Sequence, residues 1–397
     1  MLKKIFNNSL AKKYGNVQRL CEVDLLKELI KVMRQTDYSY ALMAHGQPGM
    51  VKHNLSFPHS APDERVCEIA DILMLFFDEN NLRYTFLQNK RDKRTKYNPK
   101  NPLTKLRADP VQWDLLHYKS TLTDALNTNL PVDCLSSAIL SSVATYGIFV
   151  NDSKGKTVDM SYSIARDLAA TRCNPIPINH HPRTYRVTSD YGNTRRENGY
   201  YEIQGTRTLD EFEVAAKAML VGSPIDFRNG RQRELARTLL SFARTCLIND
   251  RERTENTQKY MSIINNFAEA NGIEFDNRNE VLLPVNLVIM ESKKIFYYTY
   301  AKDEARIEFI KSNYGKNATI SDSLEEANHI FSNKEHTANY IFLTDLCEPR
   351  DLKGERALKA YEALYKIFKD VALFGLLAKD EYGIRLFHPS TFISTKP

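Results

Sequence analysis

The sequence of 397 residues has no long apolar run, no closely paired cysteines and a single tryptophan. A membrane-spanning helix needs about 18 or more consecutive apolar residues, and apolar runs such as ILMLFF at 72–77 are far shorter. The basic segment 1–15 lacks the apolar stretch of a secretory signal. We therefore expect a protein without a membrane span, located in the cytoplasm, or in the host cytoplasm if the protein is viral.

The six cysteines are spread along the whole chain, and none forms a Cys-x-x-Cys pair. A cysteine-rich zinc site needs such pairs, and a disulfide framework in a small secreted protein needs a much denser set of cysteines. The wide spacing therefore predicts free thiols in a reducing compartment.

Motifs that identify an enzyme class are also missing. The chain has no GxGxxG, HExxH, GxSxG or EF-hand pattern. The GKT at 155–157 follows a strand-like run, but Val150 stands where a phosphate-binding loop needs glycine. His45, His53 and His59 lie in one loop with spacings that fit no helical or finger site, so we expect no metal there.

Composition and charge are those of an ordinary globular protein with a mild basic excess. Hydrophobic residues make up 42% of the chain and charged residues 26%. Lys and Arg number 55 against 49 Asp and Glu, which gives a formal net charge of +6 at pH 7. This excess permits a polyanionic partner without requiring one.

Helical periodicity dominates the first two-thirds of the sequence. In the segment 22–34, for example, the apolar residues fall on one helical face. The segments with helical patterns are 22–34, 62–77, 111–127, 132–146, 158–170, 209–221, 231–247 and 254–270. They predict a mainly helical unit over 1–275, interrupted by a strand at 83–88, by a basic loop at 90–107 and by a basic loop or irregular β-hairpin at 172–208.

The pattern changes after Asn277. Apolar strand-like runs occur at 281–290, 295–300 and 340–345, with helical patterns at 302–313, 322–332 and 355–374. This order predicts a small α/β unit over 276–397. The fold class predicted for the whole chain is therefore α+β, with a mainly helical front and an α/β C-terminal unit.

Basic residues cluster in three segments, 90–107, 183–196 and 228–237, and tyrosines are interleaved with the arginines of the second. Arginine pairs with phosphate oxygens, and tyrosine rings give bases a stacking surface. A groove formed by the 183–196 loop and the helix that begins at Arg231 is predicted to bind RNA or DNA. The candidate nucleic-acid-binding residues are Arg94, Lys96, Arg183, Tyr185, Arg186, Tyr191, Arg195, Arg196, Arg231, Arg233 and Arg237.

Two other function classes stay open. Glu291 and Lys293 are two residues apart after an apolar run, so on a strand they share a face. With another acid nearby, Glu280 or Asp276, they could hold Mg²⁺ and position water, as in a metal-dependent nuclease or another phosphoryl-transfer enzyme. The segment ESKK also fits the polar turn of a β-hairpin.

The third class is a structural or interaction protein without a nucleic-acid role. In that case the clustered arginines pair with nearby acids such as Asp190, Glu197 and Glu234, and hold the protein surface together.

Overall fold

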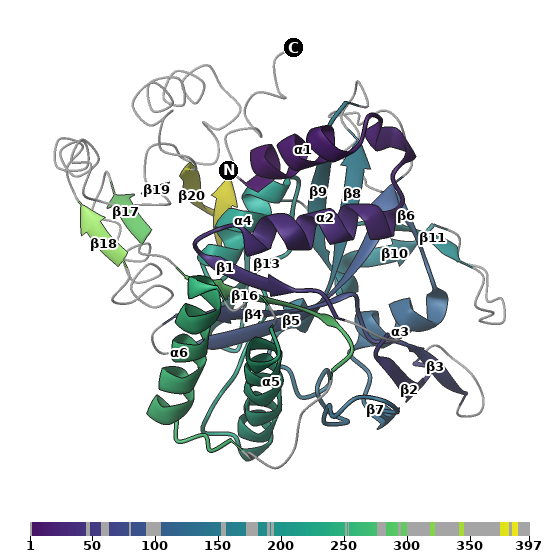
Figure 1. Cartoon of the computed structure of the whole chain (residues 1–397), viewed down its shortest axis with the longest axis vertical. Coiled ribbons are helices and arrows are strands. Elements are labelled where there is room, and N and C mark those ends of the chain that lie inside the picture. The colour runs from purple at the N-terminus through teal and green to yellow at the C-terminus, as the bar shows by residue number, and fades with distance from the viewer. Residues whose placement is uncertain are drawn as a thin grey trace.

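The computed structural model describes most of the first 292 residues and five later strands (Figure 1). The described residues are 2–44, 48–56, 63–78, 81–92, 105–151, 156–171, 182–188, 191, 194–250, 252, 254–275, 283–292, 295–299, 318–321, 341–344, 374–380 and 383–387. Within this part of the chain, no helix is long and apolar enough to cross a membrane.

An eight-stranded mixed sheet forms the centre of the protein. Along the sheet the strands are β1 (Ser39–Leu42), β16 (Asn286–Glu291), β4 (Ile72–Phe77), β5 (Leu82–Asp92), β8 (Ala144–Asn151), β9 (Val158–Ile164) and β14 (Gly205–Thr206), and β15 (Ser223–Pro224) pairs with β5. The pairs β16–β4 and β5–β8 are parallel, and the other pairs are antiparallel.

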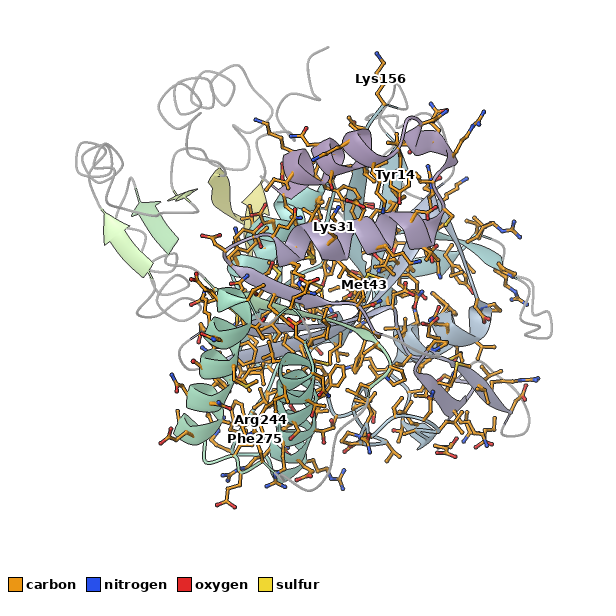
Figure 2. All side chains as sticks on the ribbon, viewed as in Figure 1. Tyr14, Lys31, Met43, Lys156, Arg244 and Phe275 are labelled. Carbon is orange, nitrogen blue, oxygen red and sulfur yellow. The ribbon has the colours of Figure 1, made fainter. Side chains whose placement is uncertain are left out.

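Helices cover both faces of this sheet, and side chains fill the space between the layers (Figures 1 and 2). Helices α1 (Leu2–Lys13), α2 (Glu22–Arg34) and α4 (Leu209–Lys217) contribute to the core on one face. Helices α3 (Pro110–Tyr118), α5 (Gly230–Ile248) and α6 (Glu255–Ala270) contribute to the core on the other. The result is a sheet buried on both sides.

Four smaller sheets accompany the central one among the described residues. They are β10–β11–β6 (Leu168–Ala170, Arg183–Val187, Lys105–Ala108), β3–β2–β7 (Glu64–Glu68, Met50–Asn54, Leu122–Asp124), the pair β12–β13 (Thr194–Glu197, Tyr200–Ile203) and β18–β17–β19–β20–β21 (Ala318–Ser321, Ile295–Thr299, Ile341–Thr344, Phe374–Asp380, Gly383–Phe387). Short 3-10 helices are η1 (Val17–Arg19), η2 (Ser141–Val143) and η3 (Ala165–Asp167).

The predicted mainly helical front is wrong, because the first 275 residues are rich in strands. The segment 62–77 was expected to be one helix, but it holds β3 and β4. In β4, Leu73, Leu75 and Phe77 enter one core, while the residues between them enter the other. A strand buried on both faces has a continuous apolar sequence, which periodicity does not distinguish from a buried helix.

The remaining helix predictions divide in the same way. Helices α2, α4, α5 and α6 lie where amphipathic patterns predicted them. The segment 158–170 instead forms β9, η3 and β10, and 132–146 forms turns followed by η2 and the start of β8. The predicted strand at 83–88 is confirmed as part of β5.

Beyond residue 275, β16 belongs to the central sheet, where it lies between β1 and β4. Strand β17 pairs with β18 and β19, so β16 and β17 do not form the hairpin that ESKK suggested. The helices predicted at 302–313, 322–332 and 355–374 lie outside the described residues. The division of the chain at 275/276 stays a prediction.

A buried carboxylate connects four elements at one end of the sheet. Asp250, just after α5, accepts hydrogen bonds from Nη2 of Arg34 in α2 at 2.8 and 2.9 Å. It also accepts from the Tyr40 hydroxyl in β1 at 2.9 Å and from the Thr257 hydroxyl in α6 at 3.0 Å. Burial alone would raise the pKa of Asp250, but the hydrogen bonds from Tyr40 and Arg34 lower it below its ordinary value.

We expect Asp250→Asn to lower the free energy of unfolding by about 2–4 kcal/mol at neutral pH, because Arg34 then loses its buried anion. The control is Glu252→Gln, which removes an exposed carboxylate 3.0 Å from the same Arg34 and should cost less than about 1 kcal/mol. Urea unfolding measures both.

The sign of the pH effect follows from the lowered pKa of Asp250. Its contribution is present above the ordinary aspartate pKa of 3.8 and is lost as the pH falls through the lower folded-state pKa. The difference between wild type and Asp250→Asn should therefore shrink in acid, and an equal difference at all pH values would contradict the assignment.

Candidate anion-binding pocket

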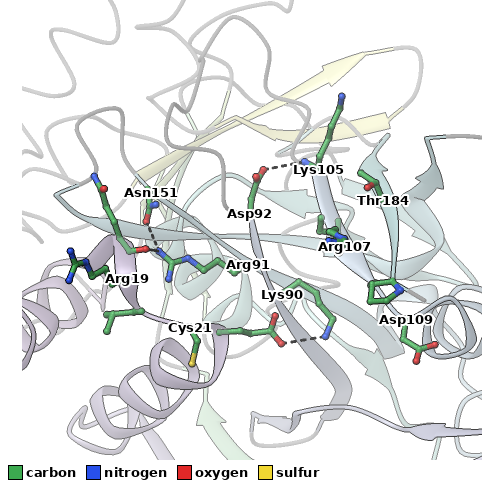
Figure 3. Close-up of a pocket in the computed structure, with 16 residues that line it drawn as sticks. Arg19, Cys21, Lys90, Arg91, Asp92, Lys105, Arg107, Asp109, Asn151 and Thr184 are labelled. Atoms are coloured by element: carbon green, nitrogen blue, oxygen red, sulfur yellow. Dashed lines mark hydrogen bonds and ion pairs between the residues drawn. The ribbon is translucent and has the colours of Figure 1, made fainter. Parts of the chain in front are cut away.

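A pocket of ≈ 1110 Å³ lies between the start of α2, the end of β5 and strand β6 (Figure 3). Its lining residues come from segments far apart in sequence. They are Gln18, Arg19, Leu20, Cys21, Glu22, Lys90, Arg91, Asp92, Lys105, Leu106, Arg107, Ala108, Asp109, Asn151, Pro182 and Thr184.

Local structure explains why basic side chains gather here. Strand β5 extends to Asp92, so Lys90 and Arg91 lie at its end. Strand β6 pairs antiparallel with β11, which places Lys105 opposite Arg186 and Arg107 opposite Thr184. Side chains alternate along a strand, and those of Lys105, Arg107 and Arg186 are exposed while the residues between them are buried.

The pocket carries more positive than negative side chains. Five are basic (Arg19, Lys90, Arg91, Lys105, Arg107) and three are acidic (Glu22, Asp92, Asp109), so the formal balance is 5 − 3 = +2. Arginine and lysine side chains at such a site attract anions, and more strongly where neighbouring acids do not neutralise them.

Two of the basic side chains are held by protein groups. Lys90 Nζ lies 3.3 Å from a Glu22 carboxylate oxygen. Arg91 donates from Nη2 to the carbonyls of Val17 and Gln18 at 3.1 Å and to Asn151 Oδ1 at 3.2 Å. Arg91 thus fixes η1 against β5, and burial lowers its pKa without removing its charge at neutral pH.

The other three basic side chains are available to a ligand. Arg19, Lys105 and Arg107 are exposed, and within the described part of the chain none of their side chains has a hydrogen-bond or ion-pair partner. Lys105 is tied to the site through its backbone, whose N–H donates to Asp92 at 3.3 Å. The open face of the pocket is therefore cationic.

A group of carboxylates lies beside the pocket around Lys90. Burial and then the charge of Asp71 raise the pKa of Glu68 to about 7. Burial also raises the pKa values of Glu22 and Asp71, and Lys90 acts in the opposite direction on both. These four groups, here called the Lys90 cluster, influence one another electrostatically, although only Glu22 and Lys90 line the pocket.

The structure brings together only part of the predicted binding set. Arg183 and Arg186 lie on β11 next to the pocket strand β6. Tyr185 is buried, with its ring stacked on Trp113 at a centroid distance of 4.8 Å. The Tyr185 ring therefore packs in the core rather than offering a stacking surface.

The arginines of β12, and Arg207 just after β14, contact other protein side chains. Arg195 forms an ion pair with Glu202, whose side chain is fully buried. The Arg196 guanidinium lies 5.6 Å from the centre of the Tyr201 ring, and Arg207 lies 6.0 Å from that of Tyr191.

Two arginines of α5 also interact with groups of the protein itself. Arg233 donates to the backbone carbonyls of Asn271 and Gly272 at the end of α6. Arg237 forms an ion pair with Glu234, and Arg231 is exposed. These contacts join α5 to the end of α6 and to its own residue Glu234. The predicted groove between this helix and the 183–196 loop stays a prediction.

The nuclease candidates do not meet in the described part of the protein. Glu291 ends β16 and forms an ion pair with Lys259 of α6. Asp276, Glu280, Lys293, Arg94 and Lys96 lie outside the described residues. Among those that are described, no group of three or more His, Cys, Asp or Glu side chains is arranged to hold a metal ion.

Sequence reasoning did not single out Arg19 and Glu22, which line the pocket. It placed Lys90, Lys105 and Arg107 in a basic loop without assigning them to a site. The available signal was Lys90 at the polar end of an apolar strand, preceded by Gln88 on the same face.

Comparisons with protein-family models, curated proteins and solved structures found no match to this chain.

A comparison of Arg195 with Arg196 tests which of these arginines stabilises the fold. We expect Arg195→Ala to lower the free energy of unfolding by roughly 3 kcal/mol, because it leaves a buried carboxylate without its cation. Arg196→Ala on the same strand should cost about 0.5–1 kcal/mol, the value of an exposed cation–π contact. Thermal and urea unfolding measure both changes, and equal losses would contradict this division.

Proposed function

We propose that this protein binds a phosphate-bearing polyanion, RNA or DNA, in the basic pocket between η1, β5 and β6. The observation that carries the proposal is that Arg19, Lys105 and Arg107 line one open pocket without acidic partners among the described residues. Phosphate oxygens are the common anions that arginine and lysine bind in this way.

The arrangement of the side chains supports a chain of phosphates rather than a single one. Lys105 and Arg107 are two residues apart on β6, and Arg186 faces Lys105 on the neighbouring strand. Residues two apart on a strand are about 6.5–7 Å apart, close to the spacing of phosphates along an extended nucleic-acid strand. Several phosphates of one backbone can therefore contact this surface together.

The pocket offers positive charge without an exposed aromatic side chain among its lining residues. Binding through phosphates alone depends on counterion release and carries little sequence information. The proposed recognition is therefore of the backbone, with weak dependence on base sequence.

The test is a fluorescence-anisotropy titration of labelled single-stranded RNA, single-stranded DNA and duplex DNA at several salt concentrations. Lys105→Ala/Arg107→Ala should weaken binding and reduce the slope of log affinity against log salt by about 1.4–1.8, since two phosphate contacts are lost. Nucleic acids of different sequence should be affected alike.

The matched control is Lys4→Ala/Lys12→Ala, which removes two positive charges from exposed positions on α1. It should leave the slope nearly unchanged. If the two double variants behave alike, the attraction is a property of overall charge and not of the pocket. Absence of binding by wild type at low salt would disprove the proposed function.

A further inference from the structure

One side-chain amide of the basic pocket has a donor that no described protein group uses. Asn151, the last residue of β8, lines the pocket and is only 3% exposed. Its Oδ1 accepts a hydrogen bond from Nη2 of Arg91 at 3.2 Å. Because a guanidinium only donates, the amide oxygen has to face it, and Nδ2 takes the other position. Within the described part of the chain, Nδ2 of Asn151 donates to no group.

The Asn151 nitrogen is open to the pocket. It is not among the described side-chain atoms that lack both a partner and access to solvent. Since the residue is otherwise buried and lines the pocket, the space that its nitrogen reaches is the pocket. A buried amide whose donor has no protein acceptor marks a place for a polar ligand or an ordered water.

The guanidinium of Arg91 is the second part of this arrangement. All of its hydrogen bonds leave from Nη2, to the carbonyls of Val17 and Gln18 and to Asn151. These acceptors are neutral, and no described carboxylate forms an ion pair with Arg91. The charge of Asp24 acts on Arg91 only from a distance. Arg91 is therefore a fixed cation whose Nε and Nη1 are left for a ligand.

The acidic side chains of the pocket have partners of their own. Glu22 forms an ion pair with Lys90. Asp92 accepts a hydrogen bond from the backbone N–H of Lys105, and Asp109 caps the start of α3. An anion that enters the pocket therefore meets positive groups that these acids do not already pair.

Arg19 brings a third donor group to the same place. It ends η1, the turn whose carbonyls hold Arg91. Figure 3 shows Arg19, Arg91 and Asn151 toward one side of the pocket, and Lys105 and Arg107 toward the other. We call the first group, Arg19, Arg91 and Asn151, the Arg91 subsite. The pocket thus has two cationic parts that one strand can contact in succession.

The chemistry of the Arg91 subsite matches a phosphate monoester. Such a group carries a charge of about −1.5 to −2 at pH 7 and three acceptor oxygens, whereas a diester in the backbone carries a single charge and has fewer free oxygens. Two guanidinium groups and an amide supply donors for all of these oxygens. Arg91 is held by three hydrogen bonds, so the phosphate has to enter the pocket to reach it. The end of a strand enters more easily than its middle.

We propose that the Arg91 subsite binds the terminal phosphate of a nucleic-acid strand, while Lys105 and Arg107 hold the phosphates next to it. The proposal rests on the proposed nucleic-acid binding, and it names the substrate class of that pocket as strands that end in a phosphate monoester. The 5′ and 3′ ends can carry the same group, and the experiment distinguishes them.

The experiment compares oligonucleotides of one sequence that differ only at their ends. They carry a 5′-phosphate, a 3′-phosphate or hydroxyl groups at both ends, with a fluorophore at an internal position, and are made as RNA and as DNA. Anisotropy titrations with the full chain give the ratio of the affinities for the phosphorylated and hydroxyl forms, here called the end preference. Wild type should bind one phosphorylated form on the order of tenfold more tightly than the hydroxyl form.

Asn151→Asp tests the amide with almost no change of size. The new carboxylate pairs with Arg91 and repels the phosphate, so the two affinities should become nearly equal. Arg19→Ala, at an exposed position, is the second variant in case Asn151→Asp does not fold, and it should reduce the end preference severalfold. Melting temperatures identify a variant that has simply unfolded.

The controls separate the two parts of the pocket. Lys105→Ala/Arg107→Ala should weaken the binding of all these oligonucleotides in the same proportion and keep the end preference. Lys4→Ala/Lys12→Ala removes exposed charges from α1 and should change neither the affinity nor the preference.

The outcomes distinguish this proposal from the proposed function. Salt-dependent binding with equal affinity for phosphorylated and hydroxyl ends overturns the terminal-phosphate site and leaves the proposed function standing. An end preference that survives both Asn151→Asp and Arg19→Ala also overturns the site. If wild type binds none of the oligonucleotides even at low salt, the proposed function and the site that rests on it both fail.

Discussion

The buried carboxylate of Asp250 links helices on both faces of the sheet to one edge strand. This carboxylate follows α5 and joins α2, β1 and α6 through hydrogen bonds that converge on two oxygens. Helix α2 lies on one face of the sheet, and α5 and α6 lie on the other. A buried anion shared in this way ties both layers to the edge strand, and losing it would leave Arg34 without its buried partner.

Helix α2 connects Asp250 with the candidate site. Its C-terminal end is held by Asp250 through Arg34, and its N-terminal residues Cys21 and Glu22 line the basic pocket. Strand β5 also holds the site in place, because it passes through the buried sheet and carries Lys90 and Arg91 near its end. The positive residues thus stand on elements fixed by the core, as pre-organised binding requires.

Amphipathic helices were predictable, whereas strands buried on both faces were recognised in some cases, such as β5, and missed in others, such as β4. Helix α2 presents one apolar face, whereas β4 is apolar at every position because helices cover both of its sides. The pocket depends on pairings such as Arg186 with Lys105, which are far apart in the sequence. Local periodicity carries no information on such pairings. The sequence showed that the segment 90–107 is basic. It did not show that Lys105 and Arg107 line the same pocket as Arg19.

The place of β16 in the sheet has a consequence for synthesis of the chain on the ribosome. Strand β1 contacts the rest of the sheet only through β16, among the strands that are described. Until residue 291 has emerged, β1 has no neighbour and β4 presents an unpaired edge. Exposed edges invite pairing with other chains, so the emerging chain stays open to such pairing for about 250 residues between β1 and its partner β16. A truncated chain that ends before Asn286 lacks β16, so its β1 and β4 keep the unpaired edges that β16 would cover.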